Sequence, residues 1–390
     1  MAADRVALAR DVITYGTTEA DIALTSGPSS GGLLAAPYAP TLVTTQHDLA
    51  AHWPPGTAPS AHPPTVRPGP GDPLPQADYV VITWTVPEQQ ALVDVLAPGV
   101  KRTEWIPYAR NWETVFKPFI RPGAPSLAAG RMASYMPVTV AGKSVLVMKS
   151  ELHLNQDGMH LPDGSESLPV ADLFAQIIDE AKPKLIITTG TAGGTMDQSN
   201  LGDVMVTRAA RFRCRSEFKG APFADSAYAS DFDIPTGRLA DATTLMQLHA
   251  AHLTEPAMGP ATERYNDGTV VPGFPNTPKI SVEGVDFAAG LPILTTDYFE
   301  FGTSTNKLGD EGCGVEMGDA VLGMVCAKLG ATAPRWLVVR NASDPQINGH
   351  LPTDPDVQAM WAVWFYAQYG YWTSVSSALA CWAIVVDDKG

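Results

Sequence analysis

A continuous apolar segment, PKLIITTG at residues 183–190, places the strongest constraint on how this chain folds. The segment shows no alternation of apolar and polar residues, so a strand formed from it would be buried on both faces, as in parallel sheets covered by helices. It follows residues 167–182, whose apolar side chains recur at helical spacing. A helix that leads into a fully buried strand is typical of α/β folds.

The same alternation of strand and helix patterns continues along most of the chain. A hairpin that turns at Ala141-Gly142 is predicted over residues 137–150. Further strands are predicted at residues 77–84, 203–214, 291–299 and 334–344. Further helices are predicted at residues 87–97, 239–252 and 314–330, and from about Val357. We therefore expect a single α/β domain with a mixed, largely parallel central sheet flanked by helices.

Two segments are expected to lie outside this domain core. Residues 1–77 carry no long periodic pattern and include a connector rich in Pro and Gly at residues 53–75. We expect them to form an N-terminal extension that precedes a domain at residues 78–390. Residues 215–285 are polar and rich in Gly and Pro, with one predicted helix, which indicates an insertion within the domain.

Charge and cysteine usage narrow the range of partners. The formal net charge is -15, which disfavours binding to nucleic-acid polymers and to anionic membranes. The four cysteines are widely spaced without a CxxC pair, and no ligand spacing indicates a metal, so we expect no metal and no cofactor. The N-terminus lacks the apolar core of a signal peptide, and polar residues interrupt the apolar stretch at residues 360–386. These features predict a cytoplasmic protein.

Four polar clusters follow predicted strands, where ligands bind in open α/β sheets. They are TTGTAGGT at residues 188–195, TDYF at 296–299, GVEMGD at 314–319 and RNASD at 340–344. Each also has a structural interpretation when taken alone. The glycines fit a turn, the aromatic pair fits a core, and the carboxylates fit helix caps or dipoles.

Taken in order, the clusters resemble the motifs of the nucleoside phosphorylase and nucleosidase superfamily. The matching stretches are TTGTAGGTMDQSNLGDVMV, TTDYF, VEMG and RNASD, and the resemblance spans about residues 78–385. It implies a nucleoside phosphorylase-like fold, with residues 78–390 as the catalytic domain. It also implies cleavage of the N-glycosidic bond of a small-molecule nucleoside by a homodimer, for which the aromatic-rich stretch at residues 361–372 offers apolar surface.

The resemblance assigns Asp344 as the general acid that protonates the leaving base, with Arg340 and Ser343 orienting it. The remaining residues that it places around the substrate have distinct tasks. Phe299 would stack on the base and the backbone at Glu300 would meet the base edge, with Asp297 in the same motif. Met317 would pack beneath the ribose. Thr191 and the backbone of Gly193 would hold phosphate or the attacking water.

The end of the first strand of the domain indicates which nucleophile is used. Phosphorylases of the superfamily carry a Gly-rich loop with an Arg there, whereas this chain has TWTVPE, ending in Glu88. A carboxylate repels phosphate and can activate water, so the sequence favours a hydrolytic nucleosidase. Glu88 also fits a favourable charge in the first turn of a helix. A phosphate-dependent phosphorylase and a non-catalytic nucleoside-binding or sensor protein stay open as alternatives.

One position departs from the family pattern. The glutamate that clamps both ribose hydroxyls in the family is Gly318 here, and Asp319 lies about 100° further round a helix. Three explanations are compatible with this change: Glu316 reaches the sugar, the loop at residues 149–157 does so, or the preferred substrate carries a modified sugar. The polar residues of that loop are Glu151, His153, Asn155 and Asp157, and we include His153 among the substrate-binding residues.

Overall fold

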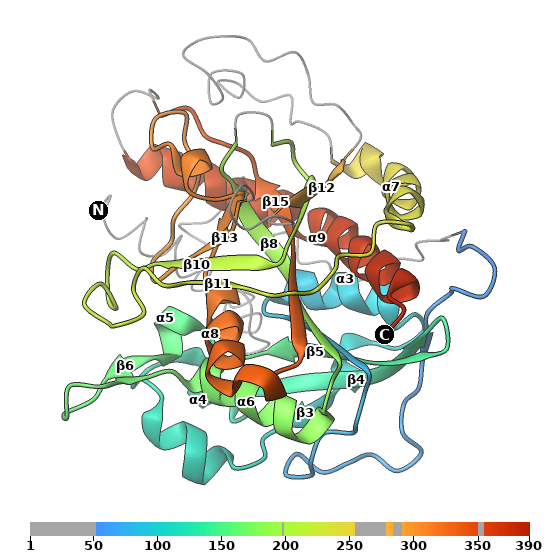
Figure 1. Cartoon of the computed structure of the whole chain (residues 1–390), viewed down its shortest axis with the longest axis horizontal. Coiled ribbons are helices and arrows are strands. Elements are labelled where there is room, and N and C mark those ends of the chain that lie inside the picture. Colours follow the sequence, from blue (N-terminus) through green and yellow to red (C-terminus); the bar gives the residue numbers. More distant parts are fainter. Residues whose placement is uncertain (1–51, 197–198, 254–277, 284–290, 350–354) are drawn as a thin grey trace, which may run out of the picture.

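The computed structural model describes residues 52–196, 199–253, 278–283, 291–349 and 355–390 (Figure 1). Residues 1–51 of the predicted extension and much of the predicted insertion lie outside the described residues. Within the described part, a single large mixed sheet is covered by helices on both faces. The predicted α/β fold with a central sheet that contains parallel pairs and flanking helices is therefore confirmed.

The described strands form one 13-stranded sheet and a separate hairpin of two short strands. The main path of the sheet is β1 (Ser60–Ala61), β4 (Ala133–Val140), β5 (Lys143–Ser150), β2 (Tyr79–Thr83), β8 (Leu185–Gly194), β14 (Gly314–Glu316), β13 (Ile293–Thr296), β10 (Ala209–Arg213) and β11 (Ala227–Ala229). The branches are β3 (Ile106–Tyr108), β9 (Val204–Thr207), β12 (Ile280–Glu283) and β15 (Arg335–Asp344). The short hairpin is β6 (Met159–His160) with β7 (Glu166–Ser167).

The helices cover the sheet as two layers with separate apolar cores. One layer contains α3 (Val86–Leu96), α7 (Leu239–Gln247) and α9 (Pro355–Asp387). The other contains α6 (Pro169–Ala181) and α8 (Asp319–Leu329), while α4 (Pro125–Ala129) and α5 (Leu154–Asp157) are short. Figure 1 shows α3 beside the long red helix α9, with α6 and α8 lying together elsewhere. Trp382 of α9 and Phe174 of α6 are among the largest fully buried side chains of the described core.

Strand β8 is the central element of the fold. It pairs in parallel with β2 over Leu185–Thr188 and with β15 along almost its whole length. At Gly190 the backbone takes a φ of +138°, and beyond it the strand continues to pair with β15 and reaches β14 at Gly193. The pairing register sets Gly193 opposite Asp344, with a bulge between Ala342 and Asp344. The glycine-rich cluster and the RNASD cluster therefore lie side by side.

Several boundaries differ from the sequence prediction. The apolar strand predicted from residues 183–190 continues to Gly194, so most of the cluster at residues 188–195 belongs to β8. The cluster at residues 340–344 lies within β15, close to the strand predicted at residues 334–344. The helix predicted at 314–330 begins only at Asp319, because Gly314–Glu316 pairs with β13 and β8. Polar residues near the site thus belong to paired strands, and this fixes their side chains more rigidly than a loop would.

The strand predicted at 203–214 is also divided in two. Thr207 ends β9 and Ala209 begins β10, and the two halves pair with different strands. The Thr207 hydroxyl accepts a hydrogen bond from the amide of Ala209 at 3.2 Å, which stabilises the corner. A single apolar run can therefore serve two parts of one sheet.

Part of the Pro-rich connector packs against the domain. β1 pairs with β4, the Trp53 ring lies 4.8 Å from the Trp382 ring, and the amide of Leu74 donates to Glu180. The four cysteines are buried and unpaired. Of the helices that the structure describes, none combines the length and the apolar character needed to span a membrane.

The bend at Gly190 predicts an unusual sensitivity to a single methyl group. A Cβ at Gly190 would lie 2.5 Å from the Glu88 carboxylate, whereas a Cβ at Gly142, which also has a positive φ, would meet nothing within 4 Å. We expect Gly142→Ala to lower the free energy of unfolding by roughly 1 kcal/mol from backbone strain. Gly190→Ala should cost at least about 2 kcal/mol more, because it also displaces a buried carboxylate. Urea denaturation of both variants measures the difference, and equal losses would contradict this account of Gly190.

Candidate active site

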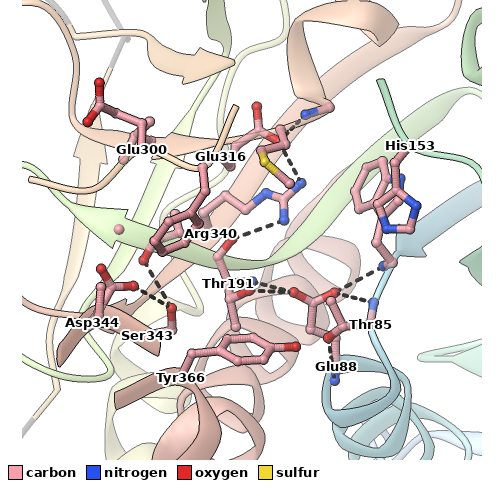
Figure 2. A pocket seen from close by; sticks show the side chains of 18 of the residues that line it. Thr85, Glu88, His153, Thr191, Glu300, Glu316, Arg340, Ser343, Asp344 and Tyr366 are labelled. Carbon is pink, nitrogen blue, oxygen red and sulfur yellow. Dashed lines mark hydrogen bonds and ion pairs between the residues drawn. The ribbon is translucent and has the colours of Figure 1, made fainter. Parts of the chain in front are cut away.

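A cavity opens where β2, β8, β14 and β15 meet α9. It is lined by Trp84, Thr85, Glu88, His153, Gln156, Thr191, Ala192, Gly193, Phe299, Glu300, Val315, Glu316, Met317, Gly318, Arg340, Ser343, Asp344, Ala362 and Tyr366. All of the residues that the sequence predicted for the site, except Asp297, are in this lining. In Figure 2, Asp344 and Ser343 lie on one side, Glu88 and His153 on the opposite side, and Thr191 and Arg340 between them.

Asp344 is a buried carboxyl group with a free oxygen. Its Oδ1 accepts a hydrogen bond from the Ser343 hydroxyl at 2.9 Å. Its Oδ2 is buried and has no hydrogen-bond partner among the described residues. Burial raises the pKa of Asp344 to about 7, and the Ser343 hydrogen bond offsets only part of that effect. A carboxyl group with this pKa can carry a proton near neutral pH and donate it into the cavity.

The pKa of Glu88 is shifted in the opposite direction to that of Asp344. One of its oxygens accepts hydrogen bonds from the Thr83 hydroxyl and from the amides of Trp84 and Thr85, which form the N-terminal cap of α3. The other oxygen accepts from the amide and the hydroxyl of Thr191, at 2.8 and 2.7 Å. Burial raises the pKa of Glu88, but the Arg340 charge and these hydrogen bonds outweigh it and hold that pKa below its usual value. Glu88 is therefore ionised.

Arg340 forms the ionic centre of the site. Its guanidinium donates to both oxygens of Asp319, at 2.8 and 2.6 Å, and to Glu316 at 3.2 Å. A fourth hydrogen bond reaches the carbonyl of Thr191. The resemblance implied that Arg340 orients Asp344, but its hydrogen bonds go to these other groups. Ser343 is the residue that holds Asp344, while Arg340 neutralises a buried acidic pair.

Glu316 has no spare acceptor position for a ligand. One oxygen accepts from the Thr295 hydroxyl and the amide of Asp319, and the other from the amide of Gly318 and from Arg340. A carboxylate offers about four acceptor positions, and all are used here. Burial, and then the charge of Asp319, raise the pKa of Glu316. Glu316 lines the cavity but is bound to the protein.

Asp319 was expected to point away from the cavity, and it does. The residue is fully buried, and both of its carboxylate oxygens pair with Arg340. It begins α8, directly after Gly318. Asp319 therefore does not stand in for the glutamate that Gly318 replaces.

Trp84 occupies the wall next to Gly318. A Cβ built on Gly318 would lie 3.2 Å from the Trp84 ring. The ring nitrogen donates to the carbonyl of Leu152 at 3.0 Å, and the Arg340 guanidinium lies 4.8 Å above the ring. The edge of the Phe174 ring faces it from a centroid distance of 6.5 Å. An aromatic ring fixed on several sides thus forms this part of the cavity.

Of the polar residues in the loop at 149–157, His153 is the one whose placement matches the sequence expectation. Glu151 pairs with Lys149 and Arg131, and Asp157 accepts from the Ser126 hydroxyl and from the amide of His153. The His153 ring lines the cavity, and its Nδ1 is buried without a hydrogen-bond partner within the part of the chain that the structure describes. Burial lowers the pKa of His153 to about 4, so the ring is neutral at physiological pH.

Aromatic and acidic residues form the side of the cavity near Asp344. Phe299 lies next to Phe301, at a centroid distance of 5.7 Å. The Glu300 carboxylate also lines the cavity and accepts hydrogen bonds from Arg213 and from the Tyr298 hydroxyl.

Asp297 is not among the lining residues. Its carboxylate accepts hydrogen bonds from the amides of Arg215, Ser216 and Phe218 and so anchors that loop. A carboxylate that satisfies several backbone amides has a structural task. Of the predicted substrate-binding residues, Asp297 is therefore the one that the structure places elsewhere.

Three lining residues carried no functional signal in the sequence. Gln156 lies in the short helix α5, which begins directly after His153, while Ala362 and Tyr366 come from α9. The spacing of four between Ala362 and Tyr366 places them on one helical face, which is equally typical of core packing. Burial raises the pKa of Tyr366, so its phenol stays protonated. Among the described residues, no group of three or more His, Cys, Asp or Glu is arranged to hold a metal ion.

Comparisons with known proteins give matches at the level of structure. No family model matches the chain, and no curated protein matches it in sequence. The 5'-methylthioadenosine/S-adenosylhomocysteine nucleosidase of Neisseria meningitidis is similar at TM-score 0.42 and 17% identity, covering 79% of this chain and 98% of that one. The futalosine hydrolase of Helicobacter pylori is similar at TM-score 0.43 and 14% identity, covering 79% and 96%.

The ionic centre predicts a pH-dependent loss of stability when Arg340 is removed. Arg340→Met should lower the free energy of unfolding by about 3–5 kcal/mol at about pH 9.5, where both buried carboxylates of the wild type are ionised and lose their cation. The loss should be smaller at about pH 6, because burial and the charge of Asp319 raise the pKa of Glu316 to about 8, so Glu316 is then protonated and carries no unpaired charge. The double variant Arg340→Met/Asp319→Asn should recover part of the loss. Chemical denaturation at both pH values measures this, and a loss independent of pH would contradict it.

Proposed function

We propose that this protein is a nucleosidase that hydrolyses the N-glycosidic bond of a nucleoside or a related N-riboside. The observation that carries the proposal is Asp344, a protonatable carboxyl group with an unpartnered oxygen in a cavity. Phe299 lines the same cavity, as a base-stacking residue would. The catalytic residues that we propose are Asp344, Ser343, Glu88 and Arg340.

In the proposed reaction, the bond between the anomeric carbon and the base nitrogen breaks, and its electron pair goes to the base. Asp344 donates its proton to a ring nitrogen of the base, so the leaving group departs neutral. Ser343 holds Asp344 in position through its hydroxyl. A positioned general acid contributes about 10²–10⁴-fold to a rate. The sugar left behind has oxocarbenium character.

The opposite side of the cavity supports attack by water. The oxygen of a water molecule forms the new bond to the anomeric carbon and releases its proton towards Glu88 or solvent. Glu88 is ionised, and its negative charge favours the cationic sugar. Thr191 donates its hydroxyl proton to Glu88, which leaves the Thr191 oxygen as an acceptor for the water. Glu88 thus acts mainly through its charge and through Thr191.

The charges around the cavity favour water over phosphate. Glu88 lines the cavity and is ionised. Among the described lining residues, Arg340 alone has a permanent positive charge, and it is already paired with Glu316 and Asp319. A phosphate dianion would therefore be repelled by Glu88 and would find the lining cation already neutralised. The cytoplasmic location and the homodimer expected from the sequence remain parts of this proposal.

The proposal is tested by incubating the protein with purine and pyrimidine nucleosides, with and without phosphate. We expect free base and free sugar at a rate that does not depend on phosphate. Accumulation of a sugar-1-phosphate, at a rate that rises with phosphate, would instead identify a phosphorylase. Binding without release of base from any nucleoside would identify a non-catalytic binding protein.

The role of Asp344 predicts the effect of a single substitution and the shape of the pH profile. Asp344→Asn should abolish cleavage and leave nucleoside binding within a few-fold, because the amide keeps the shape of the side chain but cannot donate the proton. The acid form is lost as pH rises through about 7, so kcat/KM of the wild type should fall roughly tenfold per pH unit above that value. Full activity in the variant, or a flat profile between pH 6 and 9, would exclude Asp344 as the acid.

A further inference from the structure

We propose that the sugar end of the cavity selects 2'-deoxyribonucleosides, with His153 contacting the one remaining ring hydroxyl. This inference rests on the proposed function: with the base at Asp344, the sugar lies between Thr191 and His153 (Figure 2). The side chains at the sugar end of the cavity determine which sugar hydroxyls can be bound.

Neither carboxylate at the sugar end can accept a hydrogen bond from a sugar without losing one from the protein. Glu88 accepts five hydrogen bonds, from Thr83, Trp84, Thr85 and twice from Thr191. The four acceptor positions of Glu316 are all filled by protein donors. Two neighbouring sugar hydroxyls would need acceptor positions on these carboxylates, and protein donors already occupy those positions.

The wall beside Gly318 is apolar and cannot replace them. The φ of Gly318 is -167°, which any residue adopts, so the backbone does not require glycine there. A side chain at this position would instead meet the Trp84 ring, which is held by Leu152 and Arg340. Trp84 and Met317 line this part of the cavity. Apolar surface favours a sugar carbon that carries hydrogen rather than hydroxyl.

His153 supplies a single hydrogen-bonding position. Its side chain is nine-tenths buried and lines the cavity, and its Nδ1, which lies 3.9 Å from Oδ2 of Asp157, has no hydrogen-bond partner among the described residues. The Asp157 carboxylate fixes the His153 backbone, and the neighbouring Leu152 carbonyl fixes Trp84. One ring nitrogen can bind one sugar hydroxyl. A sugar with a single ring hydroxyl therefore fits this part of the cavity, whereas a sugar with two leaves one hydroxyl without a partner.

The chemistry of the bond indicates which hydroxyl is missing. An oxygen at the 2' carbon withdraws electrons from the adjacent anomeric carbon and destabilises the oxocarbenium-like sugar. Glu88 has a lowered pKa and is therefore a weak base for activating water. A 2'-deoxy substrate needs less assistance from the nucleophile because its glycosidic bond breaks more readily. Both the wall and Glu88 therefore favour a 2'-deoxyribose whose 3' hydroxyl meets His153.

The test compares adenosine, 2'-deoxyadenosine, 3'-deoxyadenosine and 2',3'-dideoxyadenosine, together with the matching hypoxanthine nucleosides. We expect kcat/KM for the 2'-deoxy compound to exceed that of the ribo and 3'-deoxy compounds by about tenfold or more. His153→Ala should lower kcat/KM for the 2'-deoxy compound about tenfold and leave the dideoxy compound unchanged, because only the former carries the hydroxyl. His160→Ala, a half-exposed histidine outside the cavity, is the matched control and should change neither.

The outcomes separate this inference from the proposed function. Release of base with a preference for the ribo compounds, or an equal effect of His153→Ala on the dideoxy compound, overturns the inference and leaves the hydrolytic function intact. If no compound is cleaved, the proposed function fails. The same compounds and variants are then compared by their dissociation constants, measured by calorimetry, and this comparison tests the inference. The variant Trp84→Ala/Gly318→Glu, checked for folding by near-ultraviolet circular dichroism, should shift the ratio towards the ribo compounds by at least about tenfold. An unchanged ratio in this folded variant would also overturn the inference.

Discussion

The buried guanidinium of Arg340 is the interaction on which the site depends. It pairs with Asp319 at the start of α8 and with Glu316 at the end of β14, and it donates to the Thr191 carbonyl on β8. The junction of β14 with α8 and the sequence-distant strand β8 are therefore fixed around one charge. The same group lies over the Trp84 ring and helps to keep Glu88 ionised. Four hydrogen bonds to protein groups hold the guanidinium in place, and two acidic residues neutralise its charge, so it organises the cavity without attracting an anion strongly.

Two carboxyl groups in the cavity have pKa values displaced in opposite directions, and the surroundings explain both. Asp344 receives one hydrogen bond and has no cation beside it, so burial raises its pKa to about 7. Glu88 is equally buried, but five hydrogen bonds and the Arg340 charge hold its pKa below the usual value. Such a separation assigns the acid and the anionic role to different residues. It is set by local donors, since both groups lie in the same cavity.

The sequence was sufficient to predict the fold class, because buried strands and amphipathic helices alternate with clear periodicity. It also indicated most of the lining, because Thr191, Ser343 and Asp344 lie in recognisable clusters beside paired strands. It could not predict that Arg340 would turn from Asp344 to Asp319, since that choice depends on where α8 begins. For a different reason, Trp84 was given no role although it lies in the TWTVPE stretch, and Tyr366 carried no signal at all. Aromatic residues are as typical of cores as of binding sites, and α9 brings Tyr366 to the cavity through tertiary packing alone.

The effect of Gly318, which departs from the family motif, follows from the residues that surround it in the structure. In the sequence it was a missing carboxylate with three possible replacements. In the structure Glu316 is bound by four protein donors, and its relocation would leave two backbone amides without an acceptor and remove one of the hydrogen bonds of Arg340. The loop at residues 149–157 contributes one neutral nitrogen instead of a charge, because burial keeps His153 uncharged. The loss of a carboxylate is therefore matched by an aromatic wall and a single polar group, and this combination specifies a less hydroxylated ligand.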